Sequence, residues 1–399
     1  MRIETFILFI IVFRSFGISA QTLTLKYQDY IDQVKGKNYE LKIENSKVQA
    51  AQAKSKGISL PPPMVSLTQM RQGESETVNG YEISQMIPFP SKIHHDSTSR
   101  QNELHMQELG SKARSVQILA ESRLLYYHLW AVQRKIDLLK EKKEALEEHL
   151  RLTRSSVRSD SFASAHLLKT ESDRDLLDIE IESERQSQQK IQADLFLQMG
   201  QEPGDALIIV EELSLPQVSE LKNDVSADAV QIQSLEKGLE VARSREKEAS
   251  ASWLPDLTLK YKEVGASSMS VSSKEWMVGM TLPFLFFWEP QSISKMASAE
   301  RLQAEYELEK SRRSVKLQHG QLMYKLKSIE KQYRDYQEKI IPRAVKRMKV
   351  THNIAPRDME SLIDHREAKE SLPEYKLRAL ELRTQLEENY AELQKIGGD

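Results

Sequence analysis

One structural unit occurs twice in this chain, and this repetition constrains the fold more than any single motif. Each copy reads proline, apolar stretch, polar loop, apolar stretch, proline: LPPPMVSLTQM with YEISQMIPFPSK, and later WLPDLTLKYKEV with EWMVGMTLPFLFFWEP. Pro63 and Pro255 are 192 residues apart, whereas Pro88 and Pro283 are 195 residues apart. The difference indicates a small insertion in the second loop. A duplication this long predicts two copies of one fold unit.

Each copy contains two predicted β-strands that form a hairpin. The strands are expected at about residues 63–70 and 79–88 in the first copy, and at about 255–263 and 275–284 in the second. Their side chains alternate with a period of two, which is typical of strands with two different faces. In the second copy the apolar, aromatic face consists of Leu257, Leu259, Tyr261, Trp276, Val278, Met280 and Leu282. The flanking prolines fit strand ends, where a residue without an N–H group is tolerated.

Long helices are predicted around each hairpin. The longest proline-free stretches follow the hairpins, at residues 92–155 and 291–341, and the second could continue past Pro342 to residue 352. Apolar residues recur there in steps of four and three, from Leu125 to Leu150 and from Leu322 to Ile340. This heptad spacing is typical of helices that pack by knobs into holes. A polar break and a returning helix follow each stretch, so each repeat is predicted to be a helical hairpin whose tip lies opposite the β-hairpin.

The sequence predicts a signal peptide (1–20), a first repeat (21–208), a linker (209–222) and a second repeat (223–399). The N-terminus has a basic start, a short apolar run and small residues before Gln21, which is typical of a secretory signal and too short to span a bilayer. A buried N-terminal helix of a cytosolic protein is the alternative. The chain has no cysteine, which agrees with an oxidising compartment and excludes a thiolate metal site. A strand is expected at residues 206–210, between the repeats.

Composition and motifs argue against a nucleic-acid-binding protein and against an enzyme. The 57 basic and 59 acidic residues leave a net charge of −2, and no long block is strongly basic. The sequence has no G-x-S-x-G motif and no phosphate-binding glycine loop. A metal site needs several converging ligands, and incidental surface positions are the simplest interpretation of His94, His95, His166, His352 and His365. We therefore expect no catalytic residue, no cofactor and no metal.

The number of strands limits what the apolar face can contact. A closed membrane barrel needs about eight strands, and one chain supplies four, so contact with lipid would require an oligomer. Two chains would give eight strands and three would give twelve. Aromatic residues cluster at the strand ends, as in the girdle at a membrane interface: Tyr261, Trp276, Phe284, Phe286, Phe287 and Trp288. The alternative keeps the hairpins in water, packed on each other through their apolar faces.

The mature chain as a whole resembles the TolC family of outer-membrane efflux proteins. The resemblance rests on the signal peptide, the duplicated helix–hairpin–helix unit and a series of segments in the same order: NYELKIENSKVQAAQAKSKG, ISQMIPFPSK, AVQIQSLEKGLEVARSREKEASASWLPDLTLKY, MTLPFLFF and DMESLIDHREAK. The segment QMIPFPSK is also similar to the CzcC-like heavy-metal branch. The tips depart from the family, which often has glycine before the aspartate of the returning helix.

The resemblance implies a mainly α-helical chain with a small β part. Three copies would form a homotrimer with a twelve-stranded transmembrane β-barrel in the cell outer membrane and a long α-helical barrel in the periplasm. The tips would meet a periplasmic adaptor protein and an inner-membrane transporter, and the substrate would pass outward without any reaction. A structural coiled-coil protein without channel activity, exported or cytosolic, is the alternative function.

The tips are expected to form the narrowest part of such a channel. Asp160 and Asp358 are the acidic residues nearest the two tips, and Asp364 is the next candidate. A ring of carboxylates in a constriction favours cations, and the bases Arg158 and Arg357 would hold the repelling charges in a closed state. Both aspartates could equally be helix N-caps, where a carboxylate accepts hydrogen bonds from free backbone N–H groups.

Overall fold

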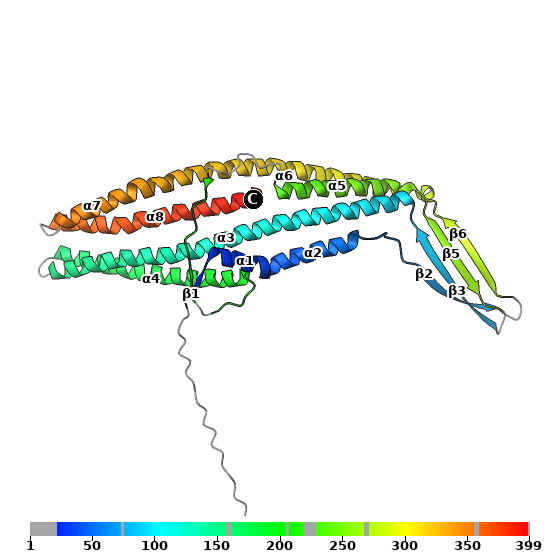
Figure 1. Ribbon diagram of the computed structural model, residues 1–399, viewed down its shortest axis with the longest axis horizontal. Coiled ribbons are helices and arrows are strands. Elements are labelled where there is room, and N and C mark those ends of the chain that lie inside the picture. Colours follow the sequence, from blue (N-terminus) through cyan, green and yellow to red (C-terminus); the bar gives the residue numbers. More distant parts are fainter. Residues whose placement is uncertain are drawn as a thin grey trace, which may run out of the picture.

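The chain forms a long, gently curved layer of helices with a β-sheet at one end and the ends of two helical hairpins at the other (Figure 1). The computed structural model describes residues 22–72, 76–156, 161–204, 207–218, 229–266, 271–354 and 359–397. The predicted signal peptide therefore lies outside the described residues. None of the described helices is both long and apolar enough to cross a membrane.

Eight α-helices make up most of the described chain. They are α1 (Tyr27–Lys37), α2 (Tyr39–Ser55), α3 (Pro90–Ser156), α4 (Ser161–Gln198), α5 (Val230–Ser250), α6 (Trp288–Asp335), α7 (Ile341–Ile354) and α8 (Met359–Gly397). With 67 residues, α3 is about 100 Å long. The two predicted helical hairpins, α3–α4 and α6–α7–α8, are confirmed, and both turn back at the end far from the sheet (Figure 1).

The second long helix continues past its proline through one turn of π-helix. This turn spans Tyr336–Ile340 and separates α6 from α7. Pro342 has no N–H to donate, and its ring would clash with the carbonyl four residues earlier in a regular α-helix. That carbonyl belongs to Glu338, which lies inside the π turn. The wider turn therefore lets the rod continue instead of ending.

The four long strands form one antiparallel sheet. They are β2 (Met64–Gln72), β3 (Glu76–Ile87), β5 (Leu257–Val264) and β6 (Ser273–Met280), in the order β2-β3-β5-β6. The two hairpins join through β3 and β5, where Ile83 lies opposite Tyr261. The alternative in which the hairpins pack face to face is therefore wrong, because they meet edge to edge. The chain continues beyond β6 as a short 3₁₀ turn, Pro283–Phe286.

A smaller parallel sheet forms a belt across the middle of the helical layer. It pairs β1 (Thr22–Leu25) with β4 (Leu207–Val210). The largest apolar core lies beneath it and includes the fully buried Tyr30, Tyr126 and Tyr127. The Tyr126 hydroxyl donates to the Leu25 carbonyl at 2.8 Å and accepts from the Glu211 N–H at 3.1 Å, so one side chain fastens both strands to α3.

The helices follow the same side-by-side order as the strands. On the sheet side of the belt, α3 packs between α2 and α5, and α6 packs on α5. On the tip side, α3 packs between α4 and α8, and α7 packs on α8. One edge of the layer is therefore formed by α2 and α4 of the first repeat, and the other edge by α6 and α7 of the second repeat.

Candidate functional site

The sheet has one apolar face, which is exposed in the single chain. Residues directly opposite each other in an antiparallel ladder lie on the same face. Leu257 lies opposite Met280, Leu259 opposite Val278, and Tyr261 opposite Trp276. The ladder extends this face through β3 to β2, by way of Ile83 and Val65. Trp276 and Val278 are 79% and 74% exposed, so nothing within the described chain covers them.

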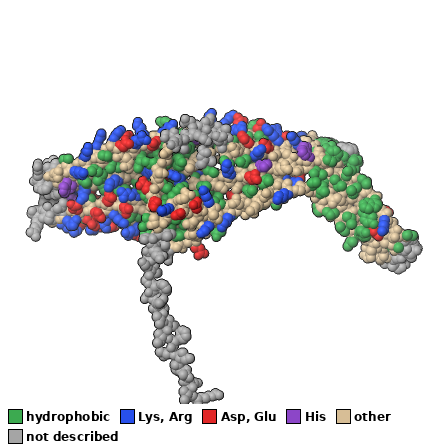
Figure 2. Space-filling model, viewed as in Figure 1, with side chains coloured by type: hydrophobic (Ala, Val, Ile, Leu, Met, Phe, Trp, Pro, Cys, Tyr) green, Lys and Arg blue, Asp and Glu red, His purple; other side chains and the backbone are tan. Residues whose placement is uncertain are grey.

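Six of the seven residues expected on the apolar strand face therefore share it. The seventh, Leu282, lies two residues beyond the end of β6. The space-filling view shows the hydrophobic surface gathered over the sheet (Figure 2). Contact of this face with lipid stays a prediction.

The opposite face of the sheet is polar. It carries Thr258, Lys260 and Lys262 on β5, and Lys262 lies opposite Glu82 of β3. Nζ of Lys260 lies 3.1 Å from Oε1 of Glu82, and both side chains are partly exposed. An aqueous surface suits this face, because its charges need solvation or pairing.

An aromatic cluster marks the end of the apolar face away from the helices. Tyr81, Tyr261 and Trp276 lie in contact across three strands, with ring centroids 6.1 Å and 4.8 Å apart. The hydroxyls of both tyrosines donate to the same carboxylate oxygen of Glu263, each at 2.8 Å. Amphipathic rings suit a membrane interface, and the role of these residues in such a girdle stays a prediction.

Asp256 connects the sheet to the helices and was not anticipated from the sequence. Its carboxylate accepts from the Phe89 N–H at 3.0 Å and from Lys92 Nζ at 2.8 Å, at the start of α3. Its own N–H donates to the Thr281 hydroxyl at 2.7 Å. One residue therefore joins the ends of β3, β5 and β6. Its position directly after Pro255 could have indicated this role, because an aspartate between a proline and a strand often forms hydrogen bonds with nearby backbone groups.

A buried charged cluster anchors the linker after β4. Arg383 and Glu387 on α8 are each only 1% exposed, and Nη2 of Arg383 lies 2.8 Å from Oε1 of Glu387. Arg383 also donates to the carbonyls of Leu213 and Ser214 at 2.9 Å and 3.0 Å. Arg123 of α3 approaches Glu387 at 3.2 Å. Burial raises the pKa of Glu387, while the two guanidinium groups oppose that shift.

Most of the predicted tip residues lie outside the described chain. Asp160, Asp358, Arg158 and Arg357 all fall there, so their roles stay predictions. Asp364 is described: it lies exposed on the second turn of α8 and has no ion pair with another described residue.

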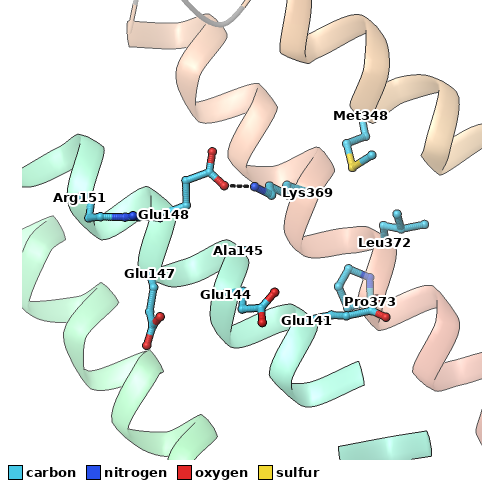
Figure 3. Close-up of a pocket in the computed structure, with 10 residues that line it drawn as sticks. All are labelled: Glu141, Glu144, Ala145, Glu147, Glu148, Arg151, Met348, Lys369, Leu372 and Pro373. Carbon is cyan, nitrogen blue, oxygen red and sulfur yellow. Dashed lines mark hydrogen bonds and ion pairs between the residues drawn. The ribbon is translucent and has the colours of Figure 1, made fainter. Parts of the chain in front are cut away.

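Ion pairs join the two helical hairpins near their tips. Lys376 pairs with Glu141 at 2.7 Å and Lys142 with Glu374 at 2.9 Å, both between α8 and α3. Closer to the tip, Lys369 binds Glu148, and this hydrogen bond lowers the pKa of the Glu148 carboxyl. A shallow groove of about 460 Å³ lies between α3 and α8, with Met348 of α7 at one side (Figure 3). It is rich in glutamates, and its lining comprises Glu141, Glu144, Ala145, Glu147, Glu148, Arg151, Met348, Lys369, Leu372 and Pro373.

Two of the histidines noted in the sequence meet within the second hairpin. The rings of His352 on α7 and His365 on α8 are 5.2 Å apart, and Nδ1 of His365 lies 3.2 Å from the Thr351 hydroxyl. Burial lowers the pKa of His365, and His352 and Lys369 lower it further. Among the described residues, no group of three or more His, Cys, Asp or Glu side chains could hold a metal ion.

Several solved structures of membrane channels share this architecture. The open state of the MtrE outer membrane channel of Neisseria gonorrhoeae matches with a TM-score of 0.77 and 15% identity, over 93% of this chain and 88% of that chain. The CmeC outer membrane channel of Campylobacter jejuni matches at 0.74 and 14%, over 93% and 85%. CusC, which forms a transmembrane channel, matches at 0.73 and 15%, over 93% and 92%. No family model and no curated protein matches the sequence.

This chain has the fold of these channels. The fold implied by the resemblance to the TolC family is therefore confirmed, as is a mainly helical chain with a small β part. The match covers both repeats, because more than nine-tenths of the chain is aligned.

Proposed function

We propose that this chain is the outer-membrane channel of a tripartite efflux system. Three copies form one conduit, with the sheets in the outer membrane and the helices in the periplasm. An inner-membrane transporter and a periplasmic adaptor protein deliver the substrate, which leaves the cell without any reaction on this chain. The fold shared with outer-membrane channels supports this assignment.

The observation that carries the proposal is the open, one-sided sheet. Its four strands have an exposed apolar face, and its border strands β2 and β6 each leave one edge unpaired within the sheet. Neighbouring strands alternate in direction along the order β2-β3-β5-β6, so β6 of one copy can pair antiparallel with β2 of the next. Three copies then close twelve strands with no free edge, which a bilayer requires.

The helical layer is suited to the second half of the conduit. It continues the same order of elements away from the sheet, so three copies enclose a helical tunnel on the same axis as the barrel. The ends of α3 and α7 lie at the end of the helical layer away from the sheet (Figure 1), and we place the adaptor contact at the tips that follow them in the chain. Charge at the tips, including Asp364, would select among ions at the narrow end.

The decisive test combines cell fractionation with electrophysiology. The native chain should sediment with outer membranes, resist a salt wash and be released by detergent as a particle with the mass of three chains. After reconstitution into planar bilayers it should conduct ions. A monomeric chain that a salt wash removes would overturn the proposal and favour the structural coiled-coil alternative, which the shared channel fold does not support.

A further inference from the structure

A cavity of about 360 Å³ lies where α3 of the first repeat meets the second helical hairpin. Three of its lining residues, Trp130, Arg134 and Leu138, come from α3. Others come from α8 and from the rod around the π turn, and Glu212 of the linker also lines it. Its volume is in the range of small-molecule sites. All of its walls belong to one chain, so the cavity is complete without a second copy.

The π turn brings three side chains of the outer rod to this cavity. Tyr333, Gln337 and Ile341 line it and are spaced by four residues. In a regular α-helix each step of four residues advances about 40° around the axis, so the first and the last would diverge by about 80°. The wider turn at Tyr336–Ile340 takes up this advance. Nε2 of Gln337 donates to the Tyr333 hydroxyl at 3.3 Å. Single π turns are frequent at functional sites.

The buried charged cluster beside the cavity has an excess of positive charge. Arg123 and Arg383 share one carboxylate, that of Glu387, so two guanidinium groups face one acid. The Arg383 side chain is only 2% exposed and lines the cavity. Its Nε and Nη1 have no hydrogen-bond partner among the described residues. A buried cation without full compensation is costly, and an anion in the cavity would supply the missing acceptor.

The other charges around the cavity also favour an anion. Arg134 is exposed and has no ion pair with a described residue, so its guanidinium is available. Lys376 is a third base of the lining, although it is paired with Glu141 at 2.7 Å. Glu212 is the one acid among the described residues of the lining.

The rest of the lining is mostly apolar and partly aromatic. The rings of Trp130 and Tyr333 are half-buried there, beside Leu138, Leu380 and Ile341. Flat rings bury a large apolar area and pack well on other rings. A cavity that combines such rings with guanidinium groups suits an anion that also has an apolar body, better than a small inorganic ion that keeps its water.

We propose that this cavity binds a small organic anion, with a carboxylate on a flat apolar body. Arg134 and Arg383 would bind the carboxylate, because guanidinium groups match its two oxygens, and the rings would contact the body. The bound anion would join α3 of the first repeat to the π turn and α8 of the second. This site lies within a single chain, so it does not depend on the proposed channel.

Equilibrium dialysis of the purified full-length chain against 2-naphthoate tests the proposal. The probe is fluorescent, and chambers with non-ionic detergent alone correct for its uptake by micelles. We expect one saturable site per chain with a dissociation constant below about 1 mM, which is ordinary for a ligand of this size. Two comparison probes separate charge from shape. Neutral 2-naphthamide and inorganic phosphate should each bind at least tenfold more weakly than 2-naphthoate.

Substitutions at exposed positions locate the site without disturbing the core. Arg134→Gln should raise the dissociation constant of 2-naphthoate about fivefold, the upper range for an exposed ion pair. Glu212→Gln should lower it, because this change removes a repelling charge. Gln337→Trp fills part of the cavity and should abolish saturable binding while every charge stays in place. Lys112→Gln is the matched control, since Lys112 is an exposed base on α3 without an ion pair to a described residue.

Thermal melting followed by circular dichroism provides a second measurement. Saturating 2-naphthoate should raise the melting temperature of the wild-type chain, because a ligand that binds only the folded state stabilises it. The rise should be smaller in Arg134→Gln and unchanged in Lys112→Gln. The absence of saturable binding would overturn the proposal, and so would binding that ignores Arg134→Gln, Glu212→Gln and Gln337→Trp. Equal binding of inorganic phosphate would overturn the organic ligand and leave a simple anion site.

Discussion

Arg383 shows how one charged side chain can organise the centre of a long helical molecule. It lies between α8 and the linker, contacts Glu387 and two linker carbonyls, and its guanidinium stacks over the Tyr127 ring at 5.6 Å. Removing two charges from water costs several kcal/mol each. The hydrogen bonds and the ring contact offset only part of this cost, because Nε and Nη1 of Arg383 and Oε1 of Glu387 are buried without a hydrogen bond to any described residue. The cluster therefore acts mainly by holding the linker in one position. Its net contribution to the stability of the chain is the smaller effect.

Replacing Arg383 should destabilise the chain strongly. Arg383→Met leaves Glu387 buried beside fewer cations and removes the donors to Leu213 and Ser214, so we expect a loss of about 3 to 5 kcal/mol in the free energy of unfolding. Thermal melting in detergent measures the effect. Adding Glu387→Leu to this variant should recover part of the loss, and Arg378→Met, an exposed change on the same helix, should cost little. Equal effects of Arg383→Met and Arg378→Met would contradict the role of burial.

The two faces of the sheet should respond differently to a buried charge. Leu259→Arg places a cation on the apolar face and should cost about 2 to 4 kcal/mol near the centre of a bilayer, which impairs insertion. Thr258→Arg is the matched control, because the neighbouring residue points to the polar face. The amount of heat-resistant trimer in outer membranes reports insertion. Comparable losses from both substitutions would argue against a membrane barrel.

The sequence identifies residues through periodicity and misses those defined by tertiary contacts. Leu257, Leu259, Trp276 and Val278 were assigned to one face because strand residues alternate. Arg383 and Glu387 were not noticed, because a base and an acid four residues apart on a charged helix look like any surface pair. Only the approach of the linker and α3 buries them.

At the scale of elements, local sequence patterns predicted the long helices and the hairpins. They did not predict the pairing of strands that lie far apart in the sequence. Heptad spacing alone indicates α3 and α6, and the structure places Leu129, Ile136 and Leu326 in buried positions. In contrast, β1 has four residues and pairs with residues more than 180 positions away, so nothing local distinguishes it from a loop. The π turn was also missed, because Pro342 indicates a disturbance without saying how the helix accommodates it.

The heptad positions of α6 should tolerate no charge. Ile329 packs against the cluster of Leu326, Met323 and Leu386, between α6 and α8. Ile329 is partly buried, so Ile329→Asp takes a carboxylate partly out of water and should lower the melting temperature by several degrees, since a loss of about 1 to 3 kcal/mol is typical of an unpaired polar group removed from water. Ser328→Asp, on the exposed side of the same turn, is the control. Identical melting curves would mean that Ile329 faces water.

Acid should loosen the second helical hairpin near its tip. The lowered pKa of His365 means that the folded chain takes up this proton at lower pH than the unfolded chain. Its contribution to stability is therefore present above the ordinary value of 6.5 and is lost as the pH falls through the lowered pKa. Protonation would add a charge beside His352 and Lys369, and Glu148 only partly compensates.

Hydrogen–deuterium exchange of α7 and α8 measures this effect. Exchange, corrected for its intrinsic pH dependence, should rise between about pH 7.5 and about pH 5 in the wild-type chain, because His residues titrate in that range. His365→Gln should remove most of the change, whereas His105→Gln, an exposed histidine on α3, should not. A rise that persists unchanged in His365→Gln would assign the effect to another group.

At the scale of the whole molecule, the sequence predicts the architecture of one chain better than it predicts which surfaces of two copies would meet. The repeat and the strand count lead to an oligomeric barrel, because four strands cannot close. The difference in charge between α4 and α7 is visible in the sequence, whereas their position at opposite edges of the helical layer is visible only in the structure.

Carboxylates at the tips should control ion selectivity in the assembled channel. Asp160→Asn with Asp358→Asn would remove six charges from three copies, so the preference for cations in planar bilayers should fall. Arg357→Ser should raise the open fraction if that base holds the tips together. Asp137→Asn, on α3 well away from the tip, serves as the control. Unchanged selectivity and conductance would leave the aspartates as helix caps and direct the search for the gate to Asp364.

The length of the unbroken helix α3 also fixes the distance between the sheet and the tip of the first hairpin. The helix runs from Pro90 at the sheet to Ser156 near the tip with no linker in between, so the reach of the chain is set by a count of residues. Removing one matched heptad from each long helix would shorten that reach by about 10 Å while keeping the packing pattern. In the proposed efflux assembly, a partner that meets the tip would have to bridge the remaining distance to its own membrane. The lengths of the two proteins are therefore tied together, and a shortened chain should work only with a partner lengthened by the same amount.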